Sequence, residues 1–319
     1  MNINLEFVLP VVISFGISVM LCPIVIPFLR MLKFGQFVRD DGPKSHLKKA
    51  GTPTMGGLII LSSVLVTSLI YIGRYPEILP VLFMTLGFGL IGFLDDYIKV
   101  VMKRSLGLKP LQKLAGQFVV TAVFLSYYFG DAGLDTMTVV PFSHIGLIMP
   151  KWMFIIFTFI VVLGTVNGVN FTDGLDGLAS GVTVIVATFF TVAALAINPS
   201  YTPITLAVVG SLLGFLLFNV HPARVFMGDT GSLALGGFVA SIALMLQIPL
   251  FIVIVGMIYL LEVVSVILQV LYFKLSHGRR IFKMATLHHH FELCGIPETQ
   301  VVAAFCIITA VLCVLGMVL

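Results

Sequence analysis

Five acidic side chains lie in three short polar stretches of an otherwise apolar chain. GFLDDYIKV carries Asp95 and Asp96, NGVNFTDGLDGLAS carries Asp173 and Asp176, and FMGDTGS carries Asp229. The whole chain has only 14 acidic residues, so five in stretches this short is a marked concentration. Carboxylates gathered at a membrane boundary are costly and repel one another. A divalent cation meeting a phosphate-bearing substrate would offset that cost, which favours an enzyme site.

The composition predicts that these stretches are held by membrane-spanning helices. Hydrophobic residues make up 59% of the 319 residues and charged residues 10%, and the mean hydropathy is +1.13. A soluble globular domain is excluded on these values. Apolar segments of roughly 17–25 residues are long enough to cross a bilayer. Ten such segments are expected at about 4–29, 55–72, 78–94, 112–129, 153–169, 178–197, 203–219, 233–247, 249–273 and 300–318.

We therefore expect an all-α integral membrane protein with ten transmembrane helices, forming one polytopic domain over residues 1–319. No cleavable signal peptide is expected, because the first apolar segment is too long and no small-residue cleavage site follows it. The connections after the odd-numbered spans hold 16 of the 18 Lys and Arg residues. The positive-inside rule then places these connections in the cytoplasm and both termini outside. All three acidic stretches fall on the cytoplasmic side.

The basic excess and the cysteines add no further class of function. The net charge of +4 is explained by topology and by anionic lipid headgroups, so no nucleic-acid partner is expected. The four cysteines have no CxxC spacing, which argues against a disulfide framework or a zinc site. The outer loop 130–152 alternates enough to predict a short β-hairpin.

Each acidic stretch has a structural interpretation beside the chemical one. Asp95 and Asp96 are expected to close the third span, where a helix C-terminus disfavours carboxylates, so Asn substitutions should leave stability unchanged or raised. Asn170, Asp173 and Asp176 would face broadly one way on a helix, unless Asp176 only caps the sixth span. Asp229 precedes the eighth span, as an N-cap or as a Mg²⁺ ligand beside a phosphate.

The polar residues of the other loops are candidates for substrate contacts. In the His288–His290 triplet, imidazoles contacting a phosphate or a donor head group are favoured over zinc, because no second His or Cys pair has a familiar spacing. Lys99 should share a face with Asp95, and Lys113 begins the fourth span. Glu262 is a lone carboxylate in the ninth span, best explained by a structural hydrogen bond at a helix break.

Taken in order, GTPTMGG, GFLDDYIKV, VNFTDGLDGL, FMGDTGS and LHHHFEL resemble the motifs of the polyprenyl-phosphate N-acetylhexosamine-1-phosphate transferase superfamily. The resemblance covers about residues 35 to 300, and LHHHFEL followed by GIPE is similar to its members with phospho-MurNAc-pentapeptide donors. It implies a Mg²⁺-dependent reaction in the bacterial plasma membrane, used in peptidoglycan synthesis. UDP-MurNAc-pentapeptide and undecaprenyl phosphate would give lipid I and UMP. It also suggests a homodimer.

The resemblance assigns roles residue by residue. Catalytic roles fall on Asp95, Asp96 and Asp173, and the Mg²⁺ ligand is Asp229. The nucleoside-binding positions are Gly174, Leu175, Asp176, Asn219 and Phe226. Other substrate contacts fall on Lys49, Lys99, Lys113, Asn170, His288, His289 and His290.

The residue chemistry fits such a reaction but leaves alternatives open. A carboxylate could deprotonate the lipid phosphate for direct attack, or form a phospho-enzyme in a two-step route. A transferase of the same superfamily with a UDP-GlcNAc donor is the main rival. A transporter or channel would place its carboxylates near the bilayer midplane, and only Glu262 suits that.

Overall fold

The computed structural model describes residues 5–31, 49, 51–102, 107–130, 132–143 and 145–318, with only the backbone given for residues 5–7. The longer helices are α1 (Leu5–Met31), α2 (Gly57–Tyr71), α3 (Leu79–Val100), α4 (Pro110–Phe129), α5 (Lys151–Thr172), α6 (Leu178–Ile197), α7 (Thr202–Asn219), α8 (Gly228–Met245), α10 (Met257–Leu275) and α12 (Glu298–Val318). The shorter elements are η2 (Pro76–Ile78), η3 (Pro199–Tyr201), η4 (Pro249–Phe251), α9 (Ile252–Val255), α11 (Leu287–Leu293), β1 (Met137–Val139) and β2 (Gly146–Ile148).

Eight helices in the described part of the chain are long and apolar enough to cross a membrane. They are α1, α3, α5, α6, α7, α8, α10 and α12. The prediction of a largely helical membrane protein is therefore confirmed. Of the other two expected spans, α2 is a shorter apolar helix of 15 residues. The other corresponds to α4, which carries Lys113 and Gln117 in its first half.

The helices form a bundle with α8 at its centre. Almost every side chain of α8 is buried, and the helix packs against α3, α5 and α2. Gly92 permits the closest approach of α3 to α8, because a Cβ there would lie 2.0 Å from the carbonyl oxygen of Asp229. The first turn of α8, which carries Asp229, is thereby held directly against the part of α3 that carries Asp95 and Asp96.

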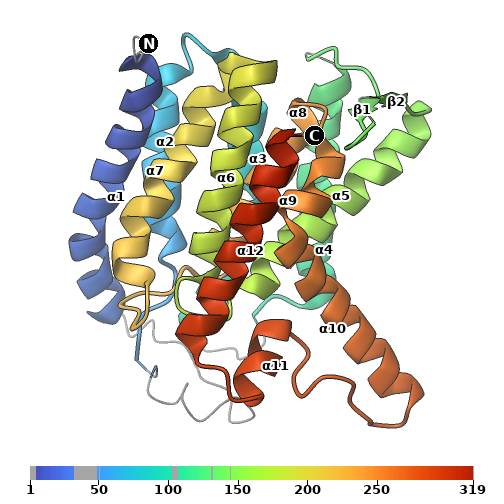
Figure 1. Ribbon diagram of the computed structural model, residues 1–319. Helices are drawn as coiled ribbons and strands as arrows, with labels where there is room; N and C mark the ends of the chain where they lie inside the picture. Colours follow the sequence, from blue (N-terminus) through green and yellow to red (C-terminus); the bar gives the residue numbers. More distant parts are fainter. Residues whose placement is uncertain are drawn as a thin grey trace.

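The connections that carry the polar motifs gather at one end of the bundle (Figure 1). Both termini and the β-hairpin lie at the opposite end, and α11 lies at the motif end. The hairpin pairs β1 with β2 antiparallel, Met137 opposite Ile148, which confirms the hairpin predicted for residues 130–152. The helical conformation is interrupted at Gly256, between α9 and α10. Helix α10 then diverges from the other helices (Figure 1).

Candidate active site

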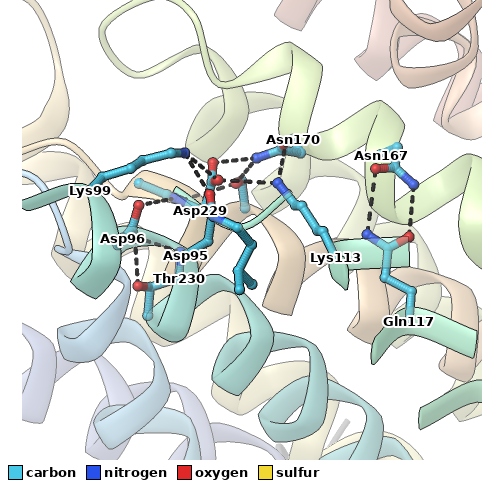
Figure 2. Close-up of polar contacts among 12 residues, drawn as sticks. Asp95, Asp96, Lys99, Lys113, Gln117, Asn167, Asn170, Asp229 and Thr230 are labelled. Carbon is cyan, nitrogen blue, oxygen red and sulfur yellow. Dashed lines mark hydrogen bonds and ion pairs between the residues drawn. The ribbon is translucent and has the colours of Figure 1, made fainter. Parts of the chain in front are cut away.

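The Asp229 carboxylate is the centre of a polar cluster built from four helices. Its Oδ2 lies 2.8 Å from the Lys99 Nζ and 3.1 Å from the Lys113 Nζ. Its Oδ1 accepts a hydrogen bond of 2.8 Å from the Asn170 side-chain amide. Figure 2 shows these side chains converging from α3, α4, α5 and α8. Residues up to 130 positions apart thus meet around one carboxylate.

Neighbouring amides hold the partners of Asp229 in place. Asn170 also donates to the Ser232 hydroxyl at 2.8 Å, and its Oδ1 accepts from Lys113 at 3.3 Å. Gln117 and Asn167 exchange two hydrogen bonds of 3.4 and 3.0 Å between α4 and α5 (Figure 2). They lie one helical turn from Lys113 and Asn170 respectively, on the same helix faces. The amide pair therefore sets the registration of α4 and α5.

Asp96 supplies the cap that α8 lacks in its own sequence. The N-cap residue of α8, Met227, makes no side-chain cap hydrogen bond. The Asp96 carboxylate accepts instead from the backbone amides of Asp229 and Thr230, at 3.2 and 2.8 Å, and from the Thr230 hydroxyl at 2.7 Å. A carboxylate at a helix N-terminus is favoured by both the free amides and the helix dipole. The interpretation of Asp229 as its own helix's N-cap is wrong, because the cap comes from α3.

The expectation that Asp95 and Asp96 terminate a helix is also wrong. Helix α3 continues to Val100, so both carboxylates lie before its last turn and are nearly fully buried. Asp95 lies 2.5 Å from the Lys99 Nζ, one turn on, which confirms their predicted shared face. Its Oδ1 also accepts from the Leu108 backbone amide at 2.6 Å. The Asp95 carboxylate therefore anchors the segment entering α4.

Asp96→Asn is therefore expected to lower stability, contrary to the prediction from sequence. The amide retains one acceptor oxygen for three donors and loses the charge at the α8 N-terminus. A cost of about 1–3 kcal/mol is expected for charged hydrogen bonds left unmade. Thermal unfolding in detergent measures it, with Glu77→Gln at the opposite end of the bundle as control. An unchanged melting temperature would contradict the capping role.

Asp173 lies just beyond the end of α5, at the edge of the same cluster. Helix α5 ends at Thr172, so Asn170, Asp173 and Asp176 do not share one helix, and that prediction is wrong. The Asp173 carboxyl accepts from the Gly228 backbone. Burial raises its pKa well above the ordinary range, and the negative charges of Asp229 and Asp96 raise it further. Asp173 thus holds a proton more readily than a free carboxyl does.

Asp176 belongs to a second cluster. One carboxylate oxygen lies 2.7 Å from the Lys49 Nζ, and the other lies 3.0 Å from both the His221 Nδ1 and the Ala223 backbone amide. Glu298 completes the cluster, 2.6 Å from the same Lys49 Nζ. The N-cap of α6 is Gly177. Asp176 therefore does not cap the sixth span. Its carboxylate joins the loop before α6 to the loops before α2 and α8, and Glu298 connects this cluster to the start of α12.

The His triplet forms the first turns of α11 and its members have different partners. His288 is buried, and its Nδ1 lies 3.0 Å from the Glu262 carboxylate. Glu262 also accepts from the backbone amides of Leu287 and His288, so it caps α11 from within α10. The expected structural hydrogen bond of Glu262 is confirmed, but the helix break lies at Gly256.

The far side of His288 touches the loop that carries Asp173. A Cβ on Gly174 would lie 2.0 Å from the His288 Nε2, so only glycine fits there. That Nε2 has no hydrogen-bond partner among the described residues. His289 lies 2.7 Å from the Glu292 carboxylate, and His290 accepts from the Lys283 backbone amide. His288 thus brings the triplet near the candidate site.

The residues assigned to a nucleoside surface lie in the loops before α6 and α8 and at the end of α7. Asn219 is buried, accepts from Ser180 at 2.7 Å and donates to the Val225 carbonyl at 2.9 Å. Phe226 is fixed through its backbone to Pro53 and Gly56. Leu175 is buried in the hydrophobic core. These contacts place the loop before α8 against the start of α2, next to Lys49 and Asp176.

The sequence alone assigns no site contact to Glu298, His221, Thr230, Ser232 or the Gln117–Asn167 pair. Glu298 was quoted only within GIPE, and its position directly before the last apolar segment was the available signal. In the sequence, the Thr230 and Ser232 hydroxyls of FMGDTGS resemble helix N-caps. The amide pair carries no local signal, because each residue resembles a solitary polar residue in an apolar helix.

Comparisons with known proteins identify the family of the chain. Residues 78–247 match the family model described as glycosyl transferase family 4, which defines the class. Residues 49–61 match signature 1 of the phospho-N-acetylmuramoyl-pentapeptide-transferases. The chain is 51% identical over 316 residues to the enzyme of that name from Caldicellulosiruptor bescii, covering 99% of this chain and 98% of the relative. It is 49% identical over 314 residues to the one from Bacillus subtilis, covering 96% and 95%.

The chain belongs to the phospho-N-acetylmuramoyl-pentapeptide-transferase family. The family predicted from its motifs is thus confirmed. The chain is a transferase of peptidoglycan synthesis and a multi-pass protein of the bacterial plasma membrane.

Proposed function

We propose that the chain transfers phospho-MurNAc-pentapeptide from its UDP donor to undecaprenyl phosphate, giving lipid I and UMP. One observation carries this proposal: Lys99, Lys113 and the Asn170 side-chain amide all contact the Asp229 carboxylate. Lys99 and Lys113 are held by acidic partners at a partly buried site, where ammonium groups interact strongly with phosphate oxygens. Such a site can receive the donor diphosphate and the lipid phosphate together.

The charges of the central cluster favour a divalent cation. Asp95, Asp96, Asp173 and Asp229 carry four negative charges when ionised, and Lys99 and Lys113 return two positive ones. Carboxylate oxygens are hard ligands of the kind that Mg²⁺ prefers. Asp229 is the proposed Mg²⁺ ligand. Mg²⁺ would supply Lewis-acid stabilisation of phosphoryl charge.

The three proposed catalytic carboxylates have separate tasks. Asp96 positions the first turn of α8, and Asp95 holds Lys99 and the segment entering α4. Asp173 is partly exposed to solvent, whereas Asp95 and Asp96 are buried, and its raised pKa suits proton exchange with a lipid phosphate. It acts either as a base for direct attack or as the nucleophile of a two-step route.

The remaining assigned residues surround the donor. Lys49, Gly174, Leu175, Asp176, Asn219 and Phe226 are proposed to receive the nucleoside, since they meet around the loops before α6 and α8. Asn170 is proposed to orient the phosphate near Lys113. His288, His289 and His290 are proposed to contact the phosphate or sugar.

The topology belongs to the same proposal. Residues 1–319 would form one domain with ten spans, α2 and α4 included, both termini outside and the motif end in the cytoplasm. The bundle supports this, because its termini and its motif connections lie at opposite ends (Figure 1). A homodimer is also proposed.

Cysteine labelling tests the sidedness. Cys294 is exposed at the motif end, whereas Cys22 and Cys313 are buried. A membrane-impermeant thiol reagent should leave Cys294 unmodified in intact cells and label it after permeabilisation. Ser143→Cys in the hairpin turn, made in a Cys294→Ser background, should react in intact cells. Labelling of Cys294 before permeabilisation would contradict the proposed orientation.

Donor discrimination tests the reaction. Purified protein with undecaprenyl phosphate and Mg²⁺ should release UMP from UDP-MurNAc-pentapeptide and not from UDP-GlcNAc. UMP release from UDP-GlcNAc alone would favour the rival transferase. A transporter or channel would release UMP from neither.

A further inference from the structure

The acidic partner of Lys49 and Asp176 has no part in the function proposed above. Glu298 is the first residue of α12, and its side chain is 10% exposed. Its Oε1 lies 2.6 Å from the Lys49 Nζ and accepts from the Asp176 backbone amide at 2.8 Å. One oxygen therefore binds both the side chain of one residue assigned to the donor and the backbone of another.

These contacts fix the positions of the Lys49 ammonium group and of the Asp176 backbone. Lys49 has a flexible four-carbon side chain, so its ammonium group takes a fixed position only where acceptors hold it. Asp176 and Glu298 are the two carboxylates on it, at 2.7 and 2.6 Å. The backbone bond from Asp176 to Glu298 fixes the loop between α5 and α6 at the same point. Removing the Glu298 charge would weaken the hold on the Lys49 ammonium group, and removing its acceptor oxygen would also loosen that loop.

The charges of the cluster explain why it suits an uncharged ligand group. Asp176 and Glu298 carry two negative charges and Lys49 carries one positive charge at close range. His221 lies 3.0 Å from Asp176 and 3.5 Å from Glu298, and is 44% exposed. A nucleobase edge presents neutral donors and acceptors, which such a network can pair without a new buried charge. The phosphates are left to Lys99 and Lys113.

We propose that Glu298 is a positioning residue of the donor site, which holds Lys49 and Asp176 in the arrangement that receives the uracil nucleoside. The proposal rests on the proposed function. Glu298 acts through its two partners and does not touch the reacting phosphates. The test must therefore separate binding of the nucleotide from the chemical step and from general stability.

The main variant is Glu298→Gln, which keeps an acceptor for the Asp176 amide and removes the charge paired with Lys49. We expect its KM for the UDP donor and its Kd for UMP to rise about tenfold, the size of one lost charged hydrogen bond. The kcat and the KM for undecaprenyl phosphate should change by less than about twofold. Glu298→Asp should recover part of the UMP affinity.

A double-mutant cycle tests the route of action. If Glu298 acts through Lys49, then Lys49→Met with Glu298→Gln should bind UMP no more weakly than Lys49→Met alone. Glu77→Gln, in η2 at the opposite end of the bundle, is the matched control and should leave all these values unchanged. Additive effects in the cycle would contradict the proposal.

Two results would overturn the inference. One is unchanged UMP affinity in Glu298→Gln. The other is a lower kcat and a lower melting temperature together with higher KM values for both substrates, which would mark a purely structural residue. UMP binding is measured without turnover, so it is separate from the reaction. A wild-type protein that binds UMP but forms no lipid product would refute the proposed function and leave the binding test intact.

Discussion

Asp229→Asn is expected to abolish transfer while the protein remains folded. The amide keeps the shape of the side chain but removes the negative charge shared by Lys99 and Lys113. It also removes the proposed ligand of Mg²⁺. Loss of a preorganised electrostatic group commonly costs about 10²–10³-fold in kcat. The measurement is the rate of UMP release across a Mg²⁺ titration, with the melting temperature measured in the same detergent.

Stability separates this variant from Asp96→Asn. The cap of α8 comes from Asp96 and uses the backbone amide of Asp229, which the substitution at Asp229 leaves in place. The melting temperature of Asp229→Asn should therefore stay close to that of the wild type. Near-normal turnover with normal Mg²⁺ dependence would remove Asp229 from the metal site.

Asp173→Asn is expected to lose activity and gain stability. The folded protein raises the pKa of this carboxyl, so the folded state binds the proton more tightly than the unfolded chain does. Its contribution to stability is then present below the ordinary Asp pKa and is lost as the pH rises toward the folded value. The Asn side chain of the variant does not ionise. At about pH 7 without divalent cations, the variant therefore avoids this loss of stability. Turnover should fall at least about 10²-fold, the lower range for a lost general base.

The pH dependence distinguishes a strained carboxyl from a general packing change. Melting temperatures of wild type and Asp173→Asn are compared in a chelator from about pH 7 down to about pH 4. The advantage of the variant should shrink as the wild-type carboxyl becomes protonated in both states. A constant difference across this range, or normal turnover, would contradict the role given to Asp173.

Sequence patterns predicted the membrane helices and the polar motifs well, because both depend on local composition. Hydropathy identified the apolar segments, and the five carboxylates proved to lie in two adjoining clusters. Lys113 was correctly placed at the start of its helix. The shared face of Asp95 and Lys99 followed from helical spacing alone.

The predictions of which acidic residues end or cap a helix were wrong, because tertiary contacts determine the partners of these carboxylates. The sequence places Asp96 near the end of its own helix, yet Asp96 caps a helix through Thr230, 134 residues further along the chain. The two helices can approach this closely because Gly92 has no side chain. Asp176 lies in a cap-like sequence, but its oxygens are taken by Lys49 and His221. Nothing local reveals which partner a carboxylate finds across the bundle.

Product formation tests the central claim most directly. Purified protein is incubated with undecaprenyl phosphate, Mg²⁺ and UDP-MurNAc-pentapeptide labelled in the peptide, and the lipid fraction is then extracted. The label should enter the lipid fraction in step with UMP release, and Asp229→Asn should transfer at least about 10²-fold less label. If the wild-type protein releases UMP but the label remains entirely in the aqueous phase, the proposed transfer is contradicted.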